Sequence, residues 1–413
     1  MKLDIEIKRE DNKKIQLIKF NVPKGCRKIA IKKRYKHSTE LELKTKIDFC
    51  FYDSENRFYG RLDRYKEELI IDEANNNGSI LPGKWTVSVE AFAVYNNLKI
   101  TLELDYDVSE KFEQYTGELH VHSDYSDGSL KTKELFEYFS ARGYDFIFLT
   151  DHNTNQGWKE IENSDGMKVY KGLELTTFNG HILLLGINDF INWYDTKGRT
   201  RSIESIYEEV KLKHGLMGIA HPHAYSGLFC AGCRWNYEIN PRFFDFIEIW
   251  NCKMKNWKAN WETIELWLDL LNEGKKIMAT AGTDFHKPED IENSLKLNVL
   301  SLANTESHII NSLRLGLFYL SKGEKLELKA DDKTFGEILR TNKPIDLKYK
   351  IENNRNDLGS LYIITRKGLK SIKNLEDSIM MDTLEERDFI VLMGTTKERE
   401  LSFITNPVFI ELL

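Results

Sequence analysis

The sequence has few cysteines and prolines, no long apolar run and no excess of charge of one sign. Five cysteines among 413 residues are an odd number and too few for a disulfide framework, which indicates a reducing compartment. No apolar run approaches the roughly 18–20 residues that span a bilayer. The start, MKLDIEIKREDNK, lacks the apolar segment of a secretory signal. We therefore expect a cytoplasmic protein with no membrane-spanning segment.

The charge balance argues against a nucleic-acid polymer as partner. Lys and Arg number 59 against 65 Asp and Glu, a formal net charge of −6, so no positive excess is available to neutralise phosphates. With 41% hydrophobic residues, the chain can also offset the entropy of ordering, which excludes general disorder. Its length predicts two or three domains at roughly 150 residues each.

The hydrophobic pattern divides the chain into three parts. Residues 1–112 contain short alternating runs such as KWTVSVEAF, which predict an all-β, sandwich-like domain. Residues 113–320 alternate buried strands with amphipathic helices, which is typical of a mainly parallel α/β core. Residues 321–413 return to strands, with one short helical piece near Phe335–Arg340. The fold class is therefore α/β in the centre with a β-rich domain on either side.

Glycines mark the helix ends in the central part. Three amphipathic segments stop at Gly143, Gly215 and Gly274, where a left-handed residue would end each helix. A further helix is predicted at Glu306–Leu315.

Histidines and carboxylates gather where the central strands end. His120 and His122 are two residues apart in a strand, so both imidazoles face one side. Random placement of ten histidines predicts about a quarter of one such pair, yet His221 and His223 form a second. The remaining residues of the group are Asp127, Asp151, His152, Glu174, His181, Glu248, Asp284 and His286.

Metal binding explains this group better than packing does. One histidine beside an apolar run is usually a hydrogen-bonded core residue, and one strand-end Asp is usually a helix cap. Together, however, buried charges must be paired or bound to metal, and only Lys171 and Lys287 are close in sequence. Imidazole and carboxylate ligands without thiolate favour Zn²⁺, Mn²⁺ or Fe²⁺. Ends of parallel strands converge on one mouth, where such folds place active sites.

The same blocks resemble a known family. YTGELHVHSDYSDG, FIFLTDHNT, GLELTTFNGHILLLG, GIAHPHA, FIEIWN and AGTDFH follow one another in the order found in the PHP (polymerase and histidinol phosphatase) superfamily. The resemblance implies a distorted (β/α)₇ barrel with two or three divalent ions, a trinuclear centre in the fullest case. The YxGELHxH opening and the EIWN block look most like its carbaryl-hydrolase (CehA/McbA) branch.

The resemblance also implies a distribution of ligands. His120, His122, Glu174 and Asp284 would hold one ion, and Asp127, His152 and His286 a second. Glu174 would bridge to a third ion held by His181 and His221. Asp151 is expected to orient a histidine rather than to bind metal. Glu248 either does the same or satisfies buried backbone.

Such a centre predicts a hydrolase that uses a metal-bridging hydroxide. The leading hypothesis is a phosphoesterase acting on a small-molecule ester, a nucleotide included. His223 is the candidate acid or substrate contact, the alternative being a supporting hydrogen bond. Arg234 and Lys253 are candidates to bind the substrate phosphate, although surface cations are often merely solvated.

Two other functions remain open. One is hydrolysis of a carboxyl or carbamate aryl ester, for which Trp235, Trp250 and Trp257 would be pocket walls unless they are core. The other is a metal-stabilised binding module without turnover. Cys230 and Cys233 form a lone CxxC, which indicates a local loop feature more than an accessory metal site. The sequence defines no oligomeric state.

Overall fold

The structure is a computed structural model that describes residues 1–35, 46–73, 78–109, 111–164, 166–225, 232–252, 257–292, 294–353, 357–382 and 387–413. Contacts between Cα atoms divide the chain into two compact units, Met1–Phe112 and Glu113–Leu413. This boundary between the two units coincides with the one predicted at residue 112. Among the described residues, no helix combines the length and apolar character needed to cross a membrane.

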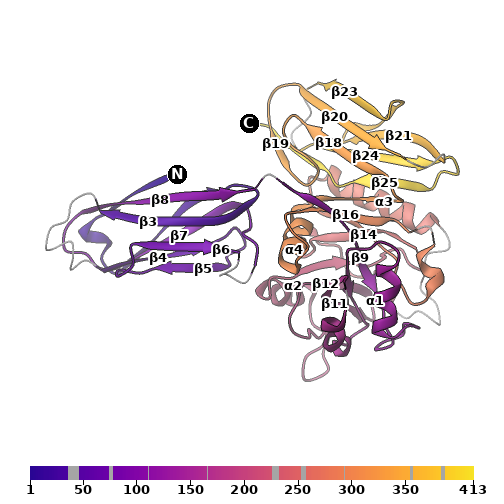
Figure 1. Cartoon of the computed structure of the whole chain (residues 1–413), viewed down its shortest axis with the longest axis horizontal. Helices are drawn as coiled ribbons and strands as arrows, with labels where there is room; N and C mark the ends of the chain where they lie inside the picture. Colours follow the sequence, from indigo (N-terminus) through magenta and orange to yellow (C-terminus); the bar gives the residue numbers. More distant parts are fainter. Residues whose placement is uncertain are drawn as a thin grey trace. The chain divides into compact units, whose positions relative to one another are not determined.

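The first unit is a sandwich of two antiparallel sheets (Figure 1). The sheet orders are β1-β8-β3-β6 and β2-β7-β4-β5. Alternating apolar residues of both sheets, Phe49 and Trp85 among them, form one buried core between the sheets. Its strands are β1 (Lys2–Ile7), β2 (Lys14–Val22), β3 (Cys26–Tyr35), β4 (Lys46–Tyr52), β5 (Phe58–Leu62), β6 (Glu68–Asp72), β7 (Gly83–Ala93) and β8 (Leu98–Val108).

A series of seven strands forms the centre of the second unit. Neighbours in sequence are neighbours in the sheet, from β9 through to β15. The strands are β9 (Glu113–Val121), β10 (Phe146–Leu149), β11 (Lys168–Thr177), β12 (Gly180–Leu185), β13 (Leu216–Ile219), β14 (Phe246–Asn251) and β15 (Met278–Gly282). All pair in parallel except β12, which is antiparallel to both β11 and β13. A tight turn joins β11 to β12, so the alternation of strand and helix expected for this part of the chain is interrupted there.

The two ends of this strand series meet. The amide of His122 donates to the carbonyl of Phe285 at 2.9 Å, and the amide of Phe285 donates to the carbonyl of His120 at 3.2 Å. Val121 and Phe285 form a parallel bridge. The chain that leaves β15 therefore lies beside β9, which brings residues from the start and the end of the series together.

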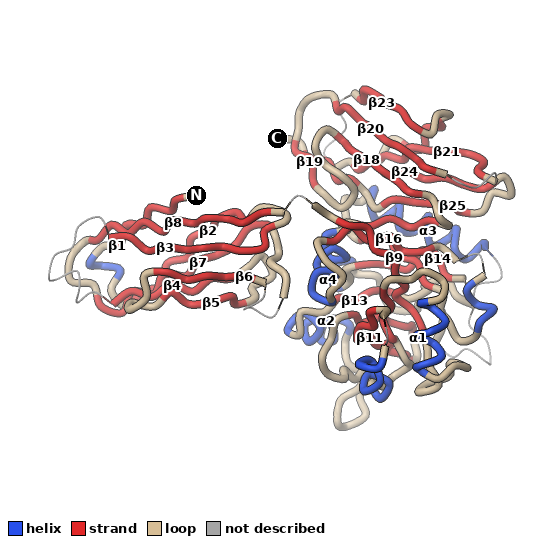
Figure 2. The backbone as a smooth tube through the Cα atoms, in the orientation of Figure 1, coloured by secondary structure: helices blue, strands red, loops and turns tan. Residues whose placement is uncertain are grey.

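Few helices cover these strands (Figure 2). They are α1 (Thr132–Ser140), α2 (Ile203–Leu212), α3 (Trp257–Asn272) and α4 (Glu306–Leu315), with short 3₁₀ turns η2 (Gln156–Asn163), η3 (Pro241–Phe243) and η4 (Pro288–Ile291). Gly143 and Gly274 have the expected positive φ. The prediction for Gly215 is wrong, because His214 takes the left-handed position with φ 60°. A Cβ at residue 215 would lie 2.9 Å from the carbonyl oxygen of Leu185, so the glycine serves close packing instead.

The last 90 or so residues do not form a separate compact unit. Strands β16 (Lys296–Ser301) and β17 (Phe318–Ser321) extend the central sheet from β9, and β17 pairs with β25. The sheet then continues through β24, β21 and β22, and β18-β20-β23 forms a second sheet over a shared core. The expected break at residue 320 is therefore bridged by strand pairing. The remaining bounds are β18 (Lys325–Ala330), β19 (Ile338–Arg340), β20 (Ile345–Glu352), β21 (Leu358–Thr365), β22 (Gly368–Ile372), β23 (Glu376–Met381), β24 (Phe389–Thr396), β25 (Leu401–Thr405) and β26 (Val408–Glu411).

The helical piece predicted near Phe335–Arg340 is wrong. Residues 338–340 form β19, which pairs in parallel with β26. Long-range strand pairing overrides the local helical pattern here.

Candidate metal centre

Two histidines point into the centre from the end of β9. His120 and His122 are fully buried. Leu119, before them, and Val121, between them, pack into hydrophobic clusters on the other side of the strand. The strand alternation expected from the sequence is therefore what aims both imidazoles at one place.

Glu174 on β11 lies in the middle of the histidines. Its Oε2 is 3.2 Å from His120 Nε2, 3.3 Å from His122 Nε2 and 2.9 Å from His152 Nδ1. Its Oε1 is 2.9 Å from His181 Nδ1 and 3.2 Å from His221 Nε2. One carboxylate thus faces five imidazoles, three of them near Oε2 and two near Oε1.

Asp284 completes the inner group from the chain after β15. Its Oδ1 lies 3.5 Å from His120 Nε2 and 3.2 Å from His122 Nε2. Asp284 has φ 48° and His221 has φ 25°, so both hold a left-handed backbone that non-glycine residues rarely adopt. Such strain costs of order 1–3 kcal/mol per residue and persists where the surroundings enforce it, commonly at functional sites.

A second, more exposed group lies beside the first. His286 Nε2 is 3.1 Å from Asp127 Oδ1, and His152 Nε2 is 3.6 Å from the same oxygen. The Nδ1 of His286 lies 2.7 Å from the carbonyl oxygen of Asp284, which leaves Nε2 to face Asp127. The sequence-predicted ligands Asp127, His152 and His286 are therefore together, and His122 is within the same cluster.

The residues predicted for a third ion meet at Glu174 Oε1. His181 begins β12, and because that strand is antiparallel its first residues lie at the end of the sheet where the parallel strands finish. His152, Glu174 and His181 form a third cluster of donor atoms. His221, two residues after β13, contacts Glu174 as well.

Glu248 both orients a histidine and satisfies a buried backbone amide, the two roles that the sequence left open. Its Oε1 is 3.0 Å from His120 Nδ1, and its Oε2 accepts from the His221 amide at 2.9 Å and from Asn251 Nδ2 at 3.0 Å. With Nδ1–H donated to this carboxylate, His120 keeps the Nε2 lone pair for a ligand. A Cβ on Gly282 would lie 2.0 Å from Glu248 Oε1 and 2.7 Å from His120 Cβ, so only glycine leaves room for this contact.

Asp151 contacts serines rather than a histidine, which corrects the expectation. It accepts from the Ser123 amide at 2.6 Å and from the hydroxyls of Ser123 and Ser126. The buried carboxylate therefore fixes the turn that carries Asp127, one residue beyond Ser126.

Charges within the group perturb one another strongly. Burial acts to raise the pKa of Glu174, but the imidazoles of His120, His152 and His181 outweigh it and hold that pKa well below its usual range. Burial acts to lower the pKa of His120, whereas Glu174, Glu248 and Asp284 raise it well above its usual value. Burial would also raise the pKa of Asp127, yet His286 and His152 hold it at about 2. The neighbouring imidazoles thus favour the ionised forms of Glu174 and Asp127, which metal binding requires.

The donor atoms fit divalent cations. His120 Nε2, His122 Nε2, Glu174 Oε2 and His181 Nε2 are buried without a hydrogen-bond partner, although buried polar atoms are ordinarily satisfied. Ligands that share one tetrahedral ion at about 2.1 Å lie about 3.4 Å apart, close to the 3.2–3.5 Å between the His120 and His122 Nε2 atoms and the carboxylate oxygens. The orphaned histidine nitrogens face the orphaned Glu174 Oε2 at the spacing that a shared ion would give.

Other predicted residues lie outside this group. His223 Nδ1 is 2.9 Å from Thr263 Oγ1, whose own proton goes to the Ala259 carbonyl. Burial lowers the pKa of His223, with Glu262 opposing and Arg234 adding to the shift. Arg234 is exposed, and its guanidinium forms no ion pair or hydrogen bond within the described part of the chain. Lys253 and Cys230 fall outside the described residues, and Cys233 is buried.

One exposed aromatic residue close in the chain to Glu174 and His181 is not among those that the sequence suggested. Trp235 and Trp250 are core residues, and the Trp257 side chain is outside the described part. Phe178 instead occupies the turn between Glu174 on β11 and His181 on β12, is 73% exposed, and contacts the Trp193 ring edge-on at 4.8 Å between centroids. Only the β11–β12 turn, recognisable from Asn179-Gly180, could have indicated it.

Residues 118–227 match the family model described as the PHP domain. The matched segment holds the predicted ligands from His120 to His221, while Asp284 and His286 lie beyond it.

Three known proteins are similar to parts of the chain. A phosphoribosyl 1,2-cyclic phosphate 1,2-diphosphodiesterase from Eggerthella lenta is 32% identical over 81 residues, covering 17% of this chain and 31% of that protein. The match thus spans about a third of that relative. A two-domain protein containing a predicted PHP-like metal-dependent phosphoesterase from Bacteroides vulgatus aligns over 72% of this chain and 96% of its own, with 15% identity and a TM-score of 0.40. An amidohydrolase from Chromobacterium violaceum with bound sulfate and no metal aligns over 42% and 89%, with 19% identity and a TM-score of 0.31.

Proposed function

We propose that this protein, which carries the PHP-domain match, is a metal-dependent phosphoesterase acting on a small-molecule phosphate ester. The observation that carries the proposal is the buried cluster in which one carboxylate, Glu174, faces five imidazoles with orphaned donor atoms between them. We also infer that β9–β15 form the distorted barrel that the PHP resemblance implies, since their ends meet at Phe285.

The ligands divide into three sets in this proposal. His120, His122, Glu174 and Asp284 would hold an inner ion, and Asp127, His152 and His286 a second. His181 and His221 would hold a third together with Glu174, for a total of two or three ions of Zn²⁺, Mn²⁺ or Fe²⁺. Ions at these positions would supply Lewis-acid chemistry, lowering the pKa of water and neutralising charge on a phosphate ester.

Arg234 is proposed to bind the substrate phosphate. The Trp235 amide donates to the Pro222 carbonyl at 3.0 Å, and the Asn236 amide donates to the Asn179 carbonyl at 2.7 Å. This segment therefore runs between the loop of His221 and the turn before His181, both of which lead into the cluster. The Arg234 guanidinium has no hydrogen-bond or ion-pair partner among the described residues, and a guanidinium matches phosphate oxygens in a bidentate manner. Lys253, from the loop after β14, keeps the same proposed role.

His223 is proposed to protonate the leaving oxygen. Thr263 accepts the Nδ1 proton because its own hydroxyl donates to the Ala259 carbonyl, so a second proton on the ring would sit on Nε2. The imidazolium so formed would give that Nε2 proton to the leaving oxygen and return to the neutral ring with its proton on Nδ1. Thr263 thereby fixes both the tautomer and the orientation of the ring.

A substrate screen with metal-reconstituted protein tests the proposal. Phosphomonoesters, phosphodiesters and aryl carboxyl esters are compared with Mn²⁺, Zn²⁺ and Fe²⁺, and turnover of phosphate esters is expected. Full metal loading without turnover of any ester would instead support a metal-stabilised binding module. Less than one ion per chain after reconstitution would contradict the metal centre itself.

One observation favours a second function, hydrolysis of aryl carboxyl or carbamate esters as in the carbaryl-hydrolase branch. Phe178, in the turn between the strands that carry Glu174 and His181, presents an exposed ring that packs on Trp193, a surface suited to an uncharged aromatic group. Hydrolysis of aryl esters alone in the screen would establish this function over the first.

A further inference from the structure

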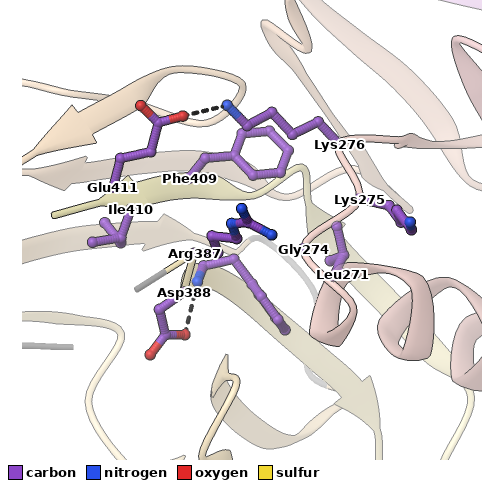
Figure 3. Close-up of a pocket in the computed structure, with 10 residues that line it drawn as sticks. Leu271, Gly274, Lys275, Lys276, Arg387, Asp388, Phe409, Ile410 and Glu411 are labelled. Atoms are coloured by element: carbon purple, nitrogen blue, oxygen red, sulfur yellow. Dashed lines mark hydrogen bonds and ion pairs between the residues drawn. The ribbon is translucent and has the colours of Figure 1, made fainter. Parts of the chain in front are cut away.

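A separate pocket of about 240 Å³ lies between the end of α3 and strands β24 and β26 (Figure 3). Its apolar lining consists of Leu271, Phe389, Phe409 and Ile410. Its polar lining consists of the cations Lys275, Lys276 and Arg387 and the acids Asp388 and Glu411. None of these residues takes part in the metal-centre contacts described above.

The two acids of the lining have different partners. Glu411 accepts from Lys276 at 2.6 Å and from Arg340 at 2.9 Å. Asp388 is buried, its Oδ1 accepts from the amides of Arg366 and Phe389, and Figure 3 shows its carboxylate pointing away from the Arg387 guanidinium. The Asp388 Oδ2 has no hydrogen-bond partner in the described part of the chain. Neither carboxylate forms an ion pair with Lys275 or Arg387 among the described residues.

Two of the cations are uncommitted. Lys275 and Arg387 make no ion pair and no side-chain hydrogen bond with any residue in the described ranges. Lys276 in contrast is used, since it pairs with Glu411 and lies over the Phe409 ring. The pocket therefore carries unneutralised positive charge on a chain whose formal net charge is −6.

The backbone directs Arg387 across this pocket. Arg387 has φ 61°, and its side chain passes over Gly274, where a Cβ would be 3.1 Å from Arg387 Cδ. Gly274 also has φ 76° as the stop of α3, so one glycine both ends the helix and admits the arginine. In Figure 3 the guanidinium lies between the α3 turn and the Phe409 ring.

We propose that this pocket binds a small oxyanion, a carboxylate or phosphate, attached to a short apolar group. Arg387 would hold the oxyanion with two parallel hydrogen bonds and Lys275 with its charge, while Phe409 and Leu271 would contact the apolar group. The volume equals that of about eight water molecules, which limits the ligand to a small molecule.

Benzoate is the first probe, because it combines one carboxylate with a flat apolar ring. Isothermal titration calorimetry of the full chain should show binding of benzoate and none of the neutral isostere benzamide. Arg387→Gln and Lys275→Gln should each weaken benzoate binding about tenfold, as expected for loss of one charge-assisted contact. Lys370→Gln, which removes an exposed cation of β22 in the same unit, is the matched control and should leave binding unchanged.

Inorganic phosphate distinguishes the two oxyanions. Tighter binding of benzoate than of phosphate identifies a carboxylate ligand, and the reverse identifies a phosphate ligand; either supports the proposal if Arg387→Gln weakens it. Anions that bind the metal centre contribute equally to wild type and variant, so only the difference between them is counted. Equal affinity of Arg387→Gln and wild type for both anions, or equal binding of benzamide, would overturn the proposal.

Discussion

At the scale of single residues, Glu174 carries the most consequence, because both of its oxygens are shared among imidazoles. Replacing Glu174 with Gln removes the negative charge that would hold the metal ions and keeps the volume of the side chain. We expect Glu174→Gln to lose at least one metal ion per chain and to reduce kcat/KM more than about 100-fold, beyond the 10–100-fold typical of a supporting residue. Metal analysis and steady-state kinetics on one preparation measure both.

The matched control for this change is Glu289→Gln. Glu289 is exposed on η4, close in sequence to the ligand His286. It should keep wild-type metal content and activity. Full metal content and activity in Glu174→Gln would contradict the bridging role.

Glu248 and Gly282 act on the centre without belonging to its ligand set. Glu248→Gln keeps a hydrogen-bond acceptor for His120 but removes the charge, so we expect metal affinity to fall about 10–100-fold with little change in fold. Gly282→Ala places a methyl group 2.0 Å from Glu248 Oε1, so it should cost about 1–3 kcal/mol of unfolding free energy as well as affinity.

Competition with a chelator and chemical denaturation separate these two effects. Unchanged metal affinity in both variants would show that His120 does not depend on Glu248.

The sequence predicted the identity of the clustered residues well and their supporting contacts poorly. Strand alternation and block order suffice to place His120, His122 and Glu174, because these features are local. The dual contact of Glu248, the serine partners of Asp151 and the need for glycine at 282 depend on atoms from other strands. No local pattern encodes such contacts.

At the scale of elements, the sandwich of the first unit contains a buried carboxylate on β4 that pairs with two arginines. The Asp48 carboxylate is buried and accepts from the Arg64 amide at 2.8 Å and from the guanidinium groups of Arg61 and Arg64. Burial acts to raise the pKa of Asp48, but these bonds to Arg64 and Arg61 outweigh it and leave the pKa below the ordinary 3.8. The unfolded chain therefore binds a proton at Asp48 more readily than the folded one.

The sign of the pH effect follows from that lowered pKa. Above the ordinary value of 3.8, ionised Asp48 contributes its full stabilisation, and this is lost as pH falls through the lower folded pKa. Asp48→Asn should cost about 1–3 kcal/mol of unfolding free energy at pH 7. The difference from wild type should shrink below pH 3.8. Denaturation curves of wild type and Asp48→Asn at pH 7, and at the lowest pH where the fold persists, measure this difference in unfolding free energy. A difference that does not change with pH would contradict the prediction.

The helices predicted within residues 113–320 lie close to α1–α4, whereas the direction of β12 was not predicted. The 3.6-residue period locates Glu306–Leu315 to the residue. The hydrophobic pattern could not predict that β12 is antiparallel to its neighbours, because a buried strand has the same apolar composition whichever way it runs. The only local sign was the short Phe178–Gly180 turn, too short for a helical connection.

At the scale of the whole molecule, the continuous sheet makes residues 113–413 one folding unit. Residues of the last strands, among them Phe389, Val391 and Ile404, belong to the same hydrophobic cluster as the core of β9–β15. The Ala279 amide on β15 donates to Asn406 at 2.8 Å, which ties the two regions by polar contact as well. Each fully buried side chain of this size contributes about 1.5–3 kcal/mol.

Two fragments test this directly. Residues 113–413 should be soluble and should bind as many metal ions per chain as the full chain. Residues 113–320 should be insoluble or unfolded, since β17 would lose β25 and expose its edge. Size-exclusion chromatography and circular dichroism of both fragments measure the outcome. A folded, metal-loaded 113–320 fragment would restore the three-domain division that the sequence pattern suggested.

The different burial of the two ligand groups has a consequence for metal exchange. His120, His122, Glu174 and Asp284 are all buried, whereas Asp127, His152 and His286 reach the surface at least in part. An ion held by the inner set would leave only when the surrounding chain opens, while an ion held by the outer set would meet solvent directly. The outer ion should therefore equilibrate with the buffer quickly, and the inner ion should record which metal was available when the protein was made.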